Sequence, residues 1–181
     1  MQAALDGGLP AVQLRDKDLS GRELWSLAEA LRTATRAAGA QLFINDRVDI
    51  AVAVDADGVQ LGEGSMPVAA VRPLLAPHQH IGVSTHAPAA PHADGADFVF
   101  FGPVAATPAK AAFGPPQGWE RLHAASAGSS VPVLAIGGLT AADIPAVQKA
   151  GAHGLAVIRA VLSADDPAAA VRNLLRTLAA P

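Results

Sequence analysis

The sequence predicts an α/β protein of the (β/α)8 barrel type, folded as a single domain over residues 1–181. Short, almost wholly apolar runs alternate along the chain with longer stretches rich in Ala and Leu, which is the pattern of strands followed by helices. Strands that are apolar on both faces pair in parallel and are covered by helices. Four segments, GGLPAVQL, DADGVQL, DGADFVF and AGAHGLAV, repeat one arrangement of helix end, small residue and strand. A repeat of roughly 20–25 residues favours a barrel over an open doubly wound sheet.

The strand pattern occurs seven times. The expected strands are residues 11–14, 41–45, 58–61, 80–84, 97–101, 132–137 and 154–158. A closed barrel of this type needs eight strands. The chain opens on MQAALDGG, which has the composition of the tail of a helix, so we expect the first strand of the barrel to be absent.

Helices are expected between these strands. Their ranges are 20–38, 47–54, 67–75, 88–94, 117–126, 140–149 and 165–179. The first begins at Ser20, with Glu23 three residues later as in a capping box. The last begins at Asp165 or Asp166, directly ahead of Pro167.

Composition excludes several classes of protein. The chain is 51% hydrophobic and 16% charged with a net charge of −3, so it is neither disordered nor a polybasic nucleic-acid binder. No apolar run approaches the roughly 20 residues of a membrane span, and the N-terminus is not a secretory signal. The chain contains no cysteine, which removes disulfides and thiolate sites and favours a cytoplasmic location.

Cationic residues gather at the carboxyl ends of the predicted strands, where barrels of this type build their sites. These residues are Arg15, Lys17, Arg47, Lys110 and Arg159, five of the 13 Lys and Arg. In an acidic protein this concentration predicts an anionic ligand at that rim.

The segment AVQLRDKD carries part of this rim. Side chains alternate faces in a strand, so Gln13, Arg15 and Lys17 share one face and Val12 and Leu14 the other. An edge strand could carry such a polar face, but a strand framed by helices is rarely an edge.

Some of these residues have a structural explanation as well. Arg47 is expected to open a helix and face solvent. Gly137 and Gly138 form either a tight turn or a phosphate cradle built from backbone N–H groups. Asp46 is either the N-cap of the following helix or a Mg²⁺ ligand among cations that hold phosphates. The loop histidines lack metal-binding spacing.

These stretches together resemble the thiamine phosphate synthases and the related thiazole tautomerases. The motifs VQLRDKDLSGREL, FINDRVDIA, ADGVQLG, IGVSTH, ADFVFFGPV, PVLAIGGLT and GAHGLAVI stand in the order and at the spacing of that family. The resemblance extends over residues 10–176. It implies a (β/α)8 barrel that joins a pyrimidine-methyl pyrophosphate to a thiazole phosphate and releases pyrophosphate.

The resemblance also implies roles for individual residues, with small phosphorylated substrates as the ligands and neither nucleic acid nor membrane as a partner. Gln13, Arg15, Lys17 and Asn45 match residues that hold the pyrophosphate and the pyrimidine. Ser84 matches a pyrophosphate or pyrimidine contact and Lys110 a pyrophosphate-binding lysine. The expected catalytic group is Arg15, Lys17, Ser84 and Lys110. The positions that match the surroundings of the thiazole phosphate are Thr107, Gly138, Ile158 and Arg159, and Gly137 is a further substrate-binding candidate beside Gly138. Asp46 matches a ligand of Mg²⁺, the expected cofactor.

The chain departs from the family pattern near the expected metal. The family reads HLGQxD where this chain reads QLGEGS at residues 60–65, so Ser65 replaces a second Asp ligand. Glu63 is the substitute carboxylate, displaced by two positions. Ala109 replaces a Thr, and Arg159 a Ser, around the phosphates.

Three functions follow from this comparison. The synthase is favoured by Lys17 and by Pro103, where tautomerases carry a catalytic His. A tautomerase-like isomerase would need a proton-transfer group, for which His86 is the rim candidate. A non-catalytic protein that binds thiazole or thiamine phosphate is the third alternative. A homodimer is also expected, because an absent strand leaves apolar barrel interior to cover.

Overall fold

The chain forms one sheet of seven parallel strands that follow one another in chain order. The computed structural model describes residues 1–88, 93–107 and 115–180. The strands are β1 (Ala11–Leu14), β2 (Gln41–Asn45), β3 (Gly58–Leu61), β4 (His80–Thr85), β5 (Phe98–Phe101), β6 (Val133–Ile136) and β7 (Gly154–Ala156). All seven predicted strands are confirmed, with ends that differ by no more than two residues.

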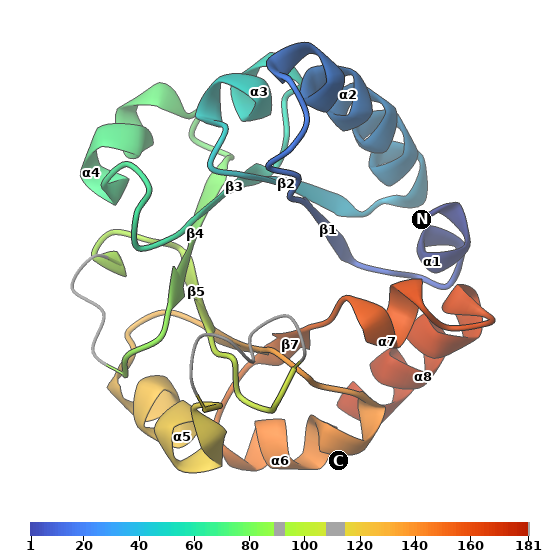
Figure 1. Ribbon diagram of the computed structural model, residues 1–181, viewed down its shortest axis with the longest axis vertical. Helices are drawn as coiled ribbons and strands as arrows, with labels where there is room; N and C mark the ends of the chain where they lie inside the picture. Colours follow the sequence, from blue (N-terminus) through green and yellow to red (C-terminus); the bar gives the residue numbers. More distant parts are fainter. Residues whose placement is uncertain (89–92, 108–114, 181) are drawn as a thin grey trace.

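Helices surround the curved sheet on its outside (Figure 1). They are α1 (Gln2–Asp6), α2 (Gly21–Ala38), α3 (Val48–Ala53), α4 (Val68–Val71), α5 (Gly118–Gly128), α6 (Ile144–Lys149), α7 (Arg159–Leu162) and α8 (Pro167–Leu178). Two 3-10 turns, Arg72–Leu74 and Ala141–Asp143, adjoin α4 and α6. The helix expected at 88–94 falls partly outside the described residues. The short helix α7 was not predicted, because its apolar sequence continues that of the preceding strand.

The start signals of the longer helices are confirmed. Ser20 caps α2, and the Glu23 carboxylate accepts the Ser20 backbone N–H at 2.9 Å. Asp166 caps α8 by accepting the Ala169 N–H at 2.9 Å. Each cap satisfies an N–H group that the first turn of a helix leaves without a partner.

Alternation along the strands separates two environments. Val12, Leu42, Val59 and Ile81 are buried in the core between the sheet and its outer helices. On the inner face of the ring, Phe98 makes an edge-to-face contact with Phe43 at 5.3 Å and a tilted one with Phe100 at 5.5 Å between ring centroids. Such aromatic pairs add about 0.5–1.5 kcal/mol each beyond burial.

The repeated sequence unit corresponds to a repeated contact at the amino ends of the strands. Asp57 precedes β3 and accepts the Leu42 N–H of β2 at 2.7 Å, while Arg32 of α2 pairs with the same carboxylate. Asp97 precedes β5 and accepts the Ile81 N–H of β4 at 2.7 Å, and Arg72 pairs with it at 2.6 Å. In two of the repeats, before β3 and before β5, an Asp thus joins the neighbouring strand to a helical element.

The sheet does not close on itself within the described residues, because no pairing joins β7 to β1. The helical layer is continuous there, since α1 packs against both α8 and α2. Ala4 of α1 is buried with Ile144, Val161, Val171 and Leu174 in one cluster. An eighth strand is therefore not among the described elements. No helix in the described ranges is long and apolar enough to cross a membrane.

Candidate functional site at the carboxyl ends of the strands

A layer of polar side chains lies at the carboxyl ends of β1 to β4. Gln13, Asn45, Gln60 and Ser84 are half-buried or buried and occupy the last positions of their strands or the position before. The strand register pairs Asn45 with Gln60. Four neighbouring strands therefore present amides and a hydroxyl at one end of the ring.

Three of the predicted site residues form a continuous hydrogen-bonded chain. Gln13 Nε2 donates to Asn45 Oδ1 at 3.1 Å, and Asn45 Nδ2 donates to Asp46 Oδ2 at 2.8 Å. The other carboxylate oxygen of Asp46, Oδ1, accepts from Ser65 Oγ. The orientation of the Asp46 carboxylate is thus set by groups from β2 and from the loop after β3.

The backbone of Asp46 is unusual. Its φ is 60°, a left-handed conformation that Asp adopts more readily than most residues. Its N–H donates to Gln60 O at 3.0 Å, which holds it against β3. The N-cap of α3 is Arg47, without a side-chain cap, so the alternative explanation of Asp46 as a helix cap is wrong. Strained residues held this firmly concentrate at functional sites.

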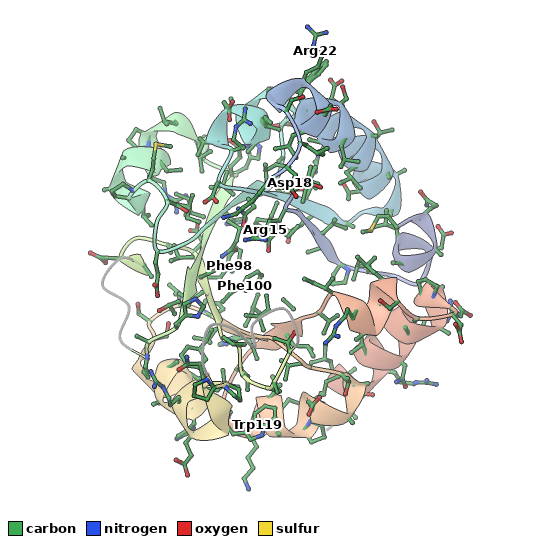
Figure 2. All side chains as sticks on the ribbon, viewed as in Figure 1. Arg15, Asp18, Arg22, Phe98, Phe100 and Trp119 are labelled. Carbon is green, nitrogen blue, oxygen red and sulfur yellow. The ribbon has the colours of Figure 1, made fainter. Side chains whose placement is uncertain are left out.

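Arg15 and Lys17 follow β1 in an exposed loop. Neither forms an ion pair with any described residue. Figure 2 shows that Arg15, like Phe98 and Phe100, lies within the ring of strands, whereas Arg22 points away from the molecule. Arg15 therefore has a charge that is available to a ligand at the mouth of the ring.

A second group of predicted residues lies where the loops after β5 and β6 meet. Val104 N–H donates to Ile136 O at 2.9 Å, and Ala105 N–H to Gly137 O at 3.0 Å. A Cβ at Gly138 would lie 2.4 Å from Ala106 O, so only Gly permits this approach. Thr107 is half-buried in the segment that follows β5.

The remaining predicted site residues do not form a single group in the described structure. Ile158 and Arg159, at the start of α7, are both exposed, and the Ile158 side chain is 66% exposed. Lys110, like Ala109, lies outside the described residues. The Glu63 carboxylate accepts the His86 N–H at 3.3 Å. Glu63 thus contacts the residue that follows β4, while Ser65 contacts Asp46.

The structural interpretation of Arg47 is confirmed. Its guanidinium forms two hydrogen bonds with Asp49, at 2.9 and 2.6 Å. The hydrogen bond from Arg47 holds the pKa of the Asp49 carboxyl below its usual range. Arg47 is therefore occupied at the surface of α3 and is not part of the rim.

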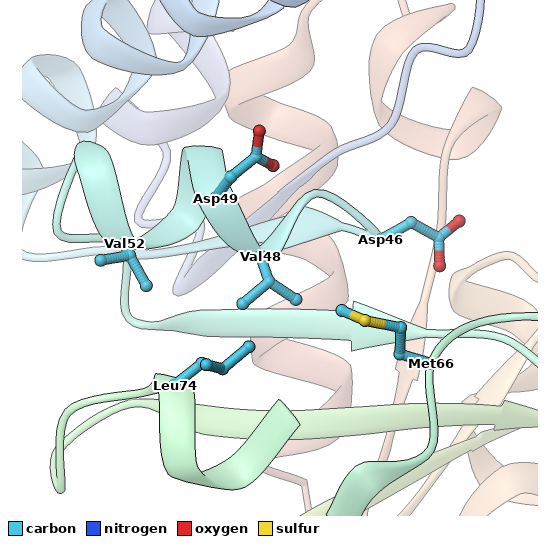
Figure 3. Close-up of a pocket in the computed structure, with 6 residues that line it drawn as sticks. All are labelled: Asp46, Val48, Asp49, Val52, Met66 and Leu74. Carbon is cyan, nitrogen blue, oxygen red and sulfur yellow. The ribbon is translucent and has the colours of Figure 1, made fainter. Parts of the chain in front are cut away.

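A groove on the outer side of the sheet adjoins Asp46 (Figure 3). Its lining consists of Asp46, Val48, Asp49, Val52, Met66 and Leu74. Figure 3 shows the Asp46 carboxylate directed away from Val52 and Leu74. A groove with apolar walls and two carboxylates does not suit an anion, so the mouth of the ring is the better candidate for the anionic ligand.

Two contacts were not anticipated from the sequence. Gln60 is 1% exposed and its Nε2 donates to Ser84 Oγ at 3.0 Å, and Ser65 binds Asp46. The alternation of Gly58 and Gln60 with buried Val59 and Leu61 could have assigned Gln60 to the inner face. The loop contact of Ser65 has no signal in the sequence.

Fold and site together define a parallel α/β protein with a ring of strands whose mouth offers amides, a carboxylate and free cations, as a phosphate-handling enzyme requires. Residues 1–161 match the profile of the family described as thiamine monophosphate synthase. The chain belongs to this family.

Individual relatives agree with this assignment. A protein of Geobacter sulfurreducens is 50% identical over 98% of this chain and 85% of its own length. A thiamine-phosphate synthase of Roseiflexus castenholzii is 48% identical over 96% of this chain and 78% of its own length. The solved thiamine phosphate pyrophosphorylase of Pyrococcus furiosus superposes with a TM-score of 0.87 at 38% identity, over 98% of this chain and 86% of that one.

Proposed function

We propose that this chain is a thiamine-phosphate synthase that couples a hydroxymethylpyrimidine pyrophosphate to a thiazole phosphate and releases pyrophosphate. Family membership supports the reaction class. The hydrogen-bonded chain from Gln13 through Asn45 to Asp46, beside the free charges of Arg15 and Lys17, is the observation that carries it. Amides suit a pyrimidine ring, and cations suit a pyrophosphate.

Each half of the mouth is assigned one substrate. Gln13 and Asn45 hold the pyrimidine, while Arg15, Lys17, Ser84 and Lys110 hold the pyrophosphate. The junction of the β5 and β6 loops receives the thiazole phosphate through Thr107, Gly137, Gly138, Ile158 and Arg159. The close approach of the two loops at Gly138 supports a binding site shaped by backbone atoms.

The residues around Asp46 fit a magnesium ion. Asp46 is exposed, the Ser65 hydroxyl oxygen lies beside it, and the Asn45 amide N–H holds its carboxylate in place. Mg²⁺ is commonly held by one or two carboxylates together with phosphate oxygens of the substrate. Within the described residues no cluster of three acidic or His side chains occurs, so Asp46 with the pyrophosphate forms the expected ligand set, and Glu63 would be a second carboxylate. Bound Mg²⁺ neutralises charge that develops on the departing pyrophosphate.

The residues of the chain then act by positioning and electrostatics. Arg15, Lys17 and Lys110 stabilise negative charge as the bond to pyrophosphate breaks, and the amides of Gln13 and Asn45 orient the ring for attack by the thiazole nitrogen. The reaction needs neither a nucleophilic side chain nor a general base. The proposed coupling therefore assigns no proton transfer to His86, whose Nδ1 contacts the Gly102 carbonyl.

A direct assay tests the proposal. Purified protein receives both substrates with and without Mg²⁺, and thiamine phosphate is followed as its fluorescent oxidation product. We expect product only with Mg²⁺, and a loss of about 100-fold or more in Asp46→Asn, since a removed transition-state contact costs 10²–10³ in rate. Asp49→Asn is the matched control, because Asp49 lies on α3 and pairs with Arg47; it should retain activity.

Two results would contradict the proposal. One is isomerisation of a carboxylated thiazole phosphate without coupling, which would identify a tautomerase. The other is binding of thiazole phosphate with no reaction of either kind, which would identify a non-catalytic binder.

We also infer that the fold is of the eight-stranded barrel type, with one strand position between β7 and β1. The continuous helical layer over that position supports this inference. A cytoplasmic location stays a prediction, which the absence of cysteine supports. A homodimer also stays a prediction. Sedimentation of the purified protein tests the homodimer.

A further inference from the structure

The loop after β3 places a neutral hydroxyl where the family motif carries a second carboxylate. Ser65 ends the segment QLGEGS, and its Oγ donates to Asp46 Oδ1. The same Oγ accepts the Gly62 N–H at 2.7 Å, and the Ser65 N–H donates to Gly62 O at 3.1 Å. The position of Ser65 is thus fixed by hydrogen bonds within its own turn, in addition to its contact with Asp46.

The Asp46 carboxylate is held from both sides. Asn45 donates to Oδ2 at 2.8 Å and Ser65 donates to Oδ1, so neither oxygen rotates without breaking a hydrogen bond. A hydroxyl has a single hydrogen to donate, and that of Ser65 is used on Asp46. The Ser65 oxygen is uncharged and is therefore a weaker ligand for Mg²⁺ than a carboxylate.

We propose that Ser65 is a positioning residue, which orients the Asp46 carboxylate for the metal in place of supplying a second charged ligand. This inference rests on the proposed function, because it takes Asp46 as the metal ligand. The network then runs from Gln13 through Asn45 and Asp46 to Ser65, and it links the groups assigned to the pyrimidine with the group assigned to the metal.

The position has a direct physical consequence. With a hydroxyl in place of the family's Asp at this position, the metal site loses one negative charge there, so metal binding depends more strongly on the pyrophosphate. Outer groups that orient a metal ligand typically change metal affinity by 10- to 100-fold when removed. Ser65→Ala should therefore weaken metal binding by about tenfold, although Ser65 donates no charge.

The test measures metal binding rather than turnover. Mn²⁺ replaces Mg²⁺, inorganic pyrophosphate is the probe, and free Mn²⁺ is counted by electron paramagnetic resonance. Ser65→Ala removes the hydroxyl, and Ser65→Thr retains it. The matched control is Ser129→Ala, because Ser129 Oγ also serves backbone groups of its own turn, donating to Val131 O at 2.8 Å and accepting Val131 N–H at 3.2 Å.

We expect Ser65→Ala to raise the dissociation constant for Mn²⁺ by about tenfold, Ser65→Thr to restore it, and Ser129→Ala to leave it unchanged. In turnover, Ser65→Ala should raise the Mg²⁺ concentration needed for half-maximal rate, with kcat at saturating Mg²⁺ and the KM for thiazole phosphate retained. The melting temperatures of all variants show whether each is folded.

Several outcomes would overturn the inference. If Ser65→Ala binds Mn²⁺ as the unchanged protein does, the hydroxyl does not orient the ligand. If Ser65→Ala and Ser65→Thr lose equal affinity for Mn²⁺, the hydrogen bond from the hydroxyl is not the cause of the loss. If the unchanged protein itself binds no Mn²⁺ with pyrophosphate, the metal role of Asp46 fails and this inference fails with it. In that case a Mg²⁺-independent coupling activity would leave the proposed reaction standing.

Discussion

The side-chain amide of Gln60 donates to the hydroxyl of Ser84 at 3.0 Å and joins β3 to β4 at the mouth of the ring. Gln60 is 1% exposed, and its Oε1 has no hydrogen-bond partner among the described residues. A Cβ at Gly82 would lie 2.2 Å from this oxygen and 2.3 Å from Phe98 Cζ. Gly82 therefore makes room for both the amide and the aromatic ring.

Gly82→Ala should destabilise the protein and disturb the Gln60–Ser84 contact. Overpacking of a filled interior costs about 1–3 kcal/mol, to be measured as a lower free energy of unfolding in urea. Gly128→Ala is the control, since a Cβ there meets nothing within 4 Å. It should be neutral or slightly stabilising. Equal effects of the two substitutions would disprove the packing argument.

Arg15→Ala should selectively weaken the binding of the pyrimidine pyrophosphate. Hydrogen bonds to charged groups contribute about 1.5–3 kcal/mol, so the KM for this substrate should rise by about tenfold or more, and the effect should shrink in high salt. Arg22→Ala removes the same charge from a side chain that points away from the molecule (Figure 2). A rise of similar size in Arg22→Ala would mean that net charge, and not position, governs binding.

Gly138→Ala should impair the thiazole phosphate site beyond its cost in stability. Gly138 has a φ of 69° and a Cβ there would lie 2.4 Å from Ala106 O, whereas Gly39, with a φ of 67°, has open space around it. Both substitutions incur left-handed strain of about 1–2 kcal/mol. Steady-state kinetics should show a raised KM for thiazole phosphate only in Gly138→Ala. An unchanged KM would remove Gly138 from the site.

Asp97 should make stability depend on pH in the acid range. Burial alone would raise the pKa of the Asp97 carboxyl, but the hydrogen bonds from Arg72 and the Ile81 N–H outweigh burial and hold the pKa below its usual value. Its contribution to stability is therefore present above the unfolded pKa, about 3.9, and is lost as the pH falls through the lower folded pKa.

The free energy of unfolding should be measured from pH 6 to pH 2, roughly the range over which carboxyl groups titrate. It should depend less on pH in Asp97→Asn than in the unchanged protein. Asp94→Asn removes an exposed carboxylate three residues away and should keep the original slope. If Asp97→Asn retains the full acid dependence, other carboxyl groups are responsible for it.

The sequence alone determined the class of fold and the end of the sheet where polar side chains gather. Apolar runs such as FVFF, separated by capped helices, could only be buried parallel strands, and all parallel strands place their carboxyl ends on the same side. Local signals therefore sufficed for the strands, for the caps at Ser20 and Asp166, and for the polar position of Gln13 in β1, whereas Arg15 lies in the loop after that strand.

The tertiary structure decided which of these groups touch. Whether Asp46 capped α3 or faced the mouth depended on its backbone conformation and on hydrogen bonds from Asn45 and Ser65. Ser65 lies in a separate loop, 19 positions further along the chain. The packing of Gly82 under Gln60 depends likewise on a neighbouring strand. Contacts of this kind join residues that only folding brings together, so no periodicity or local motif encodes them.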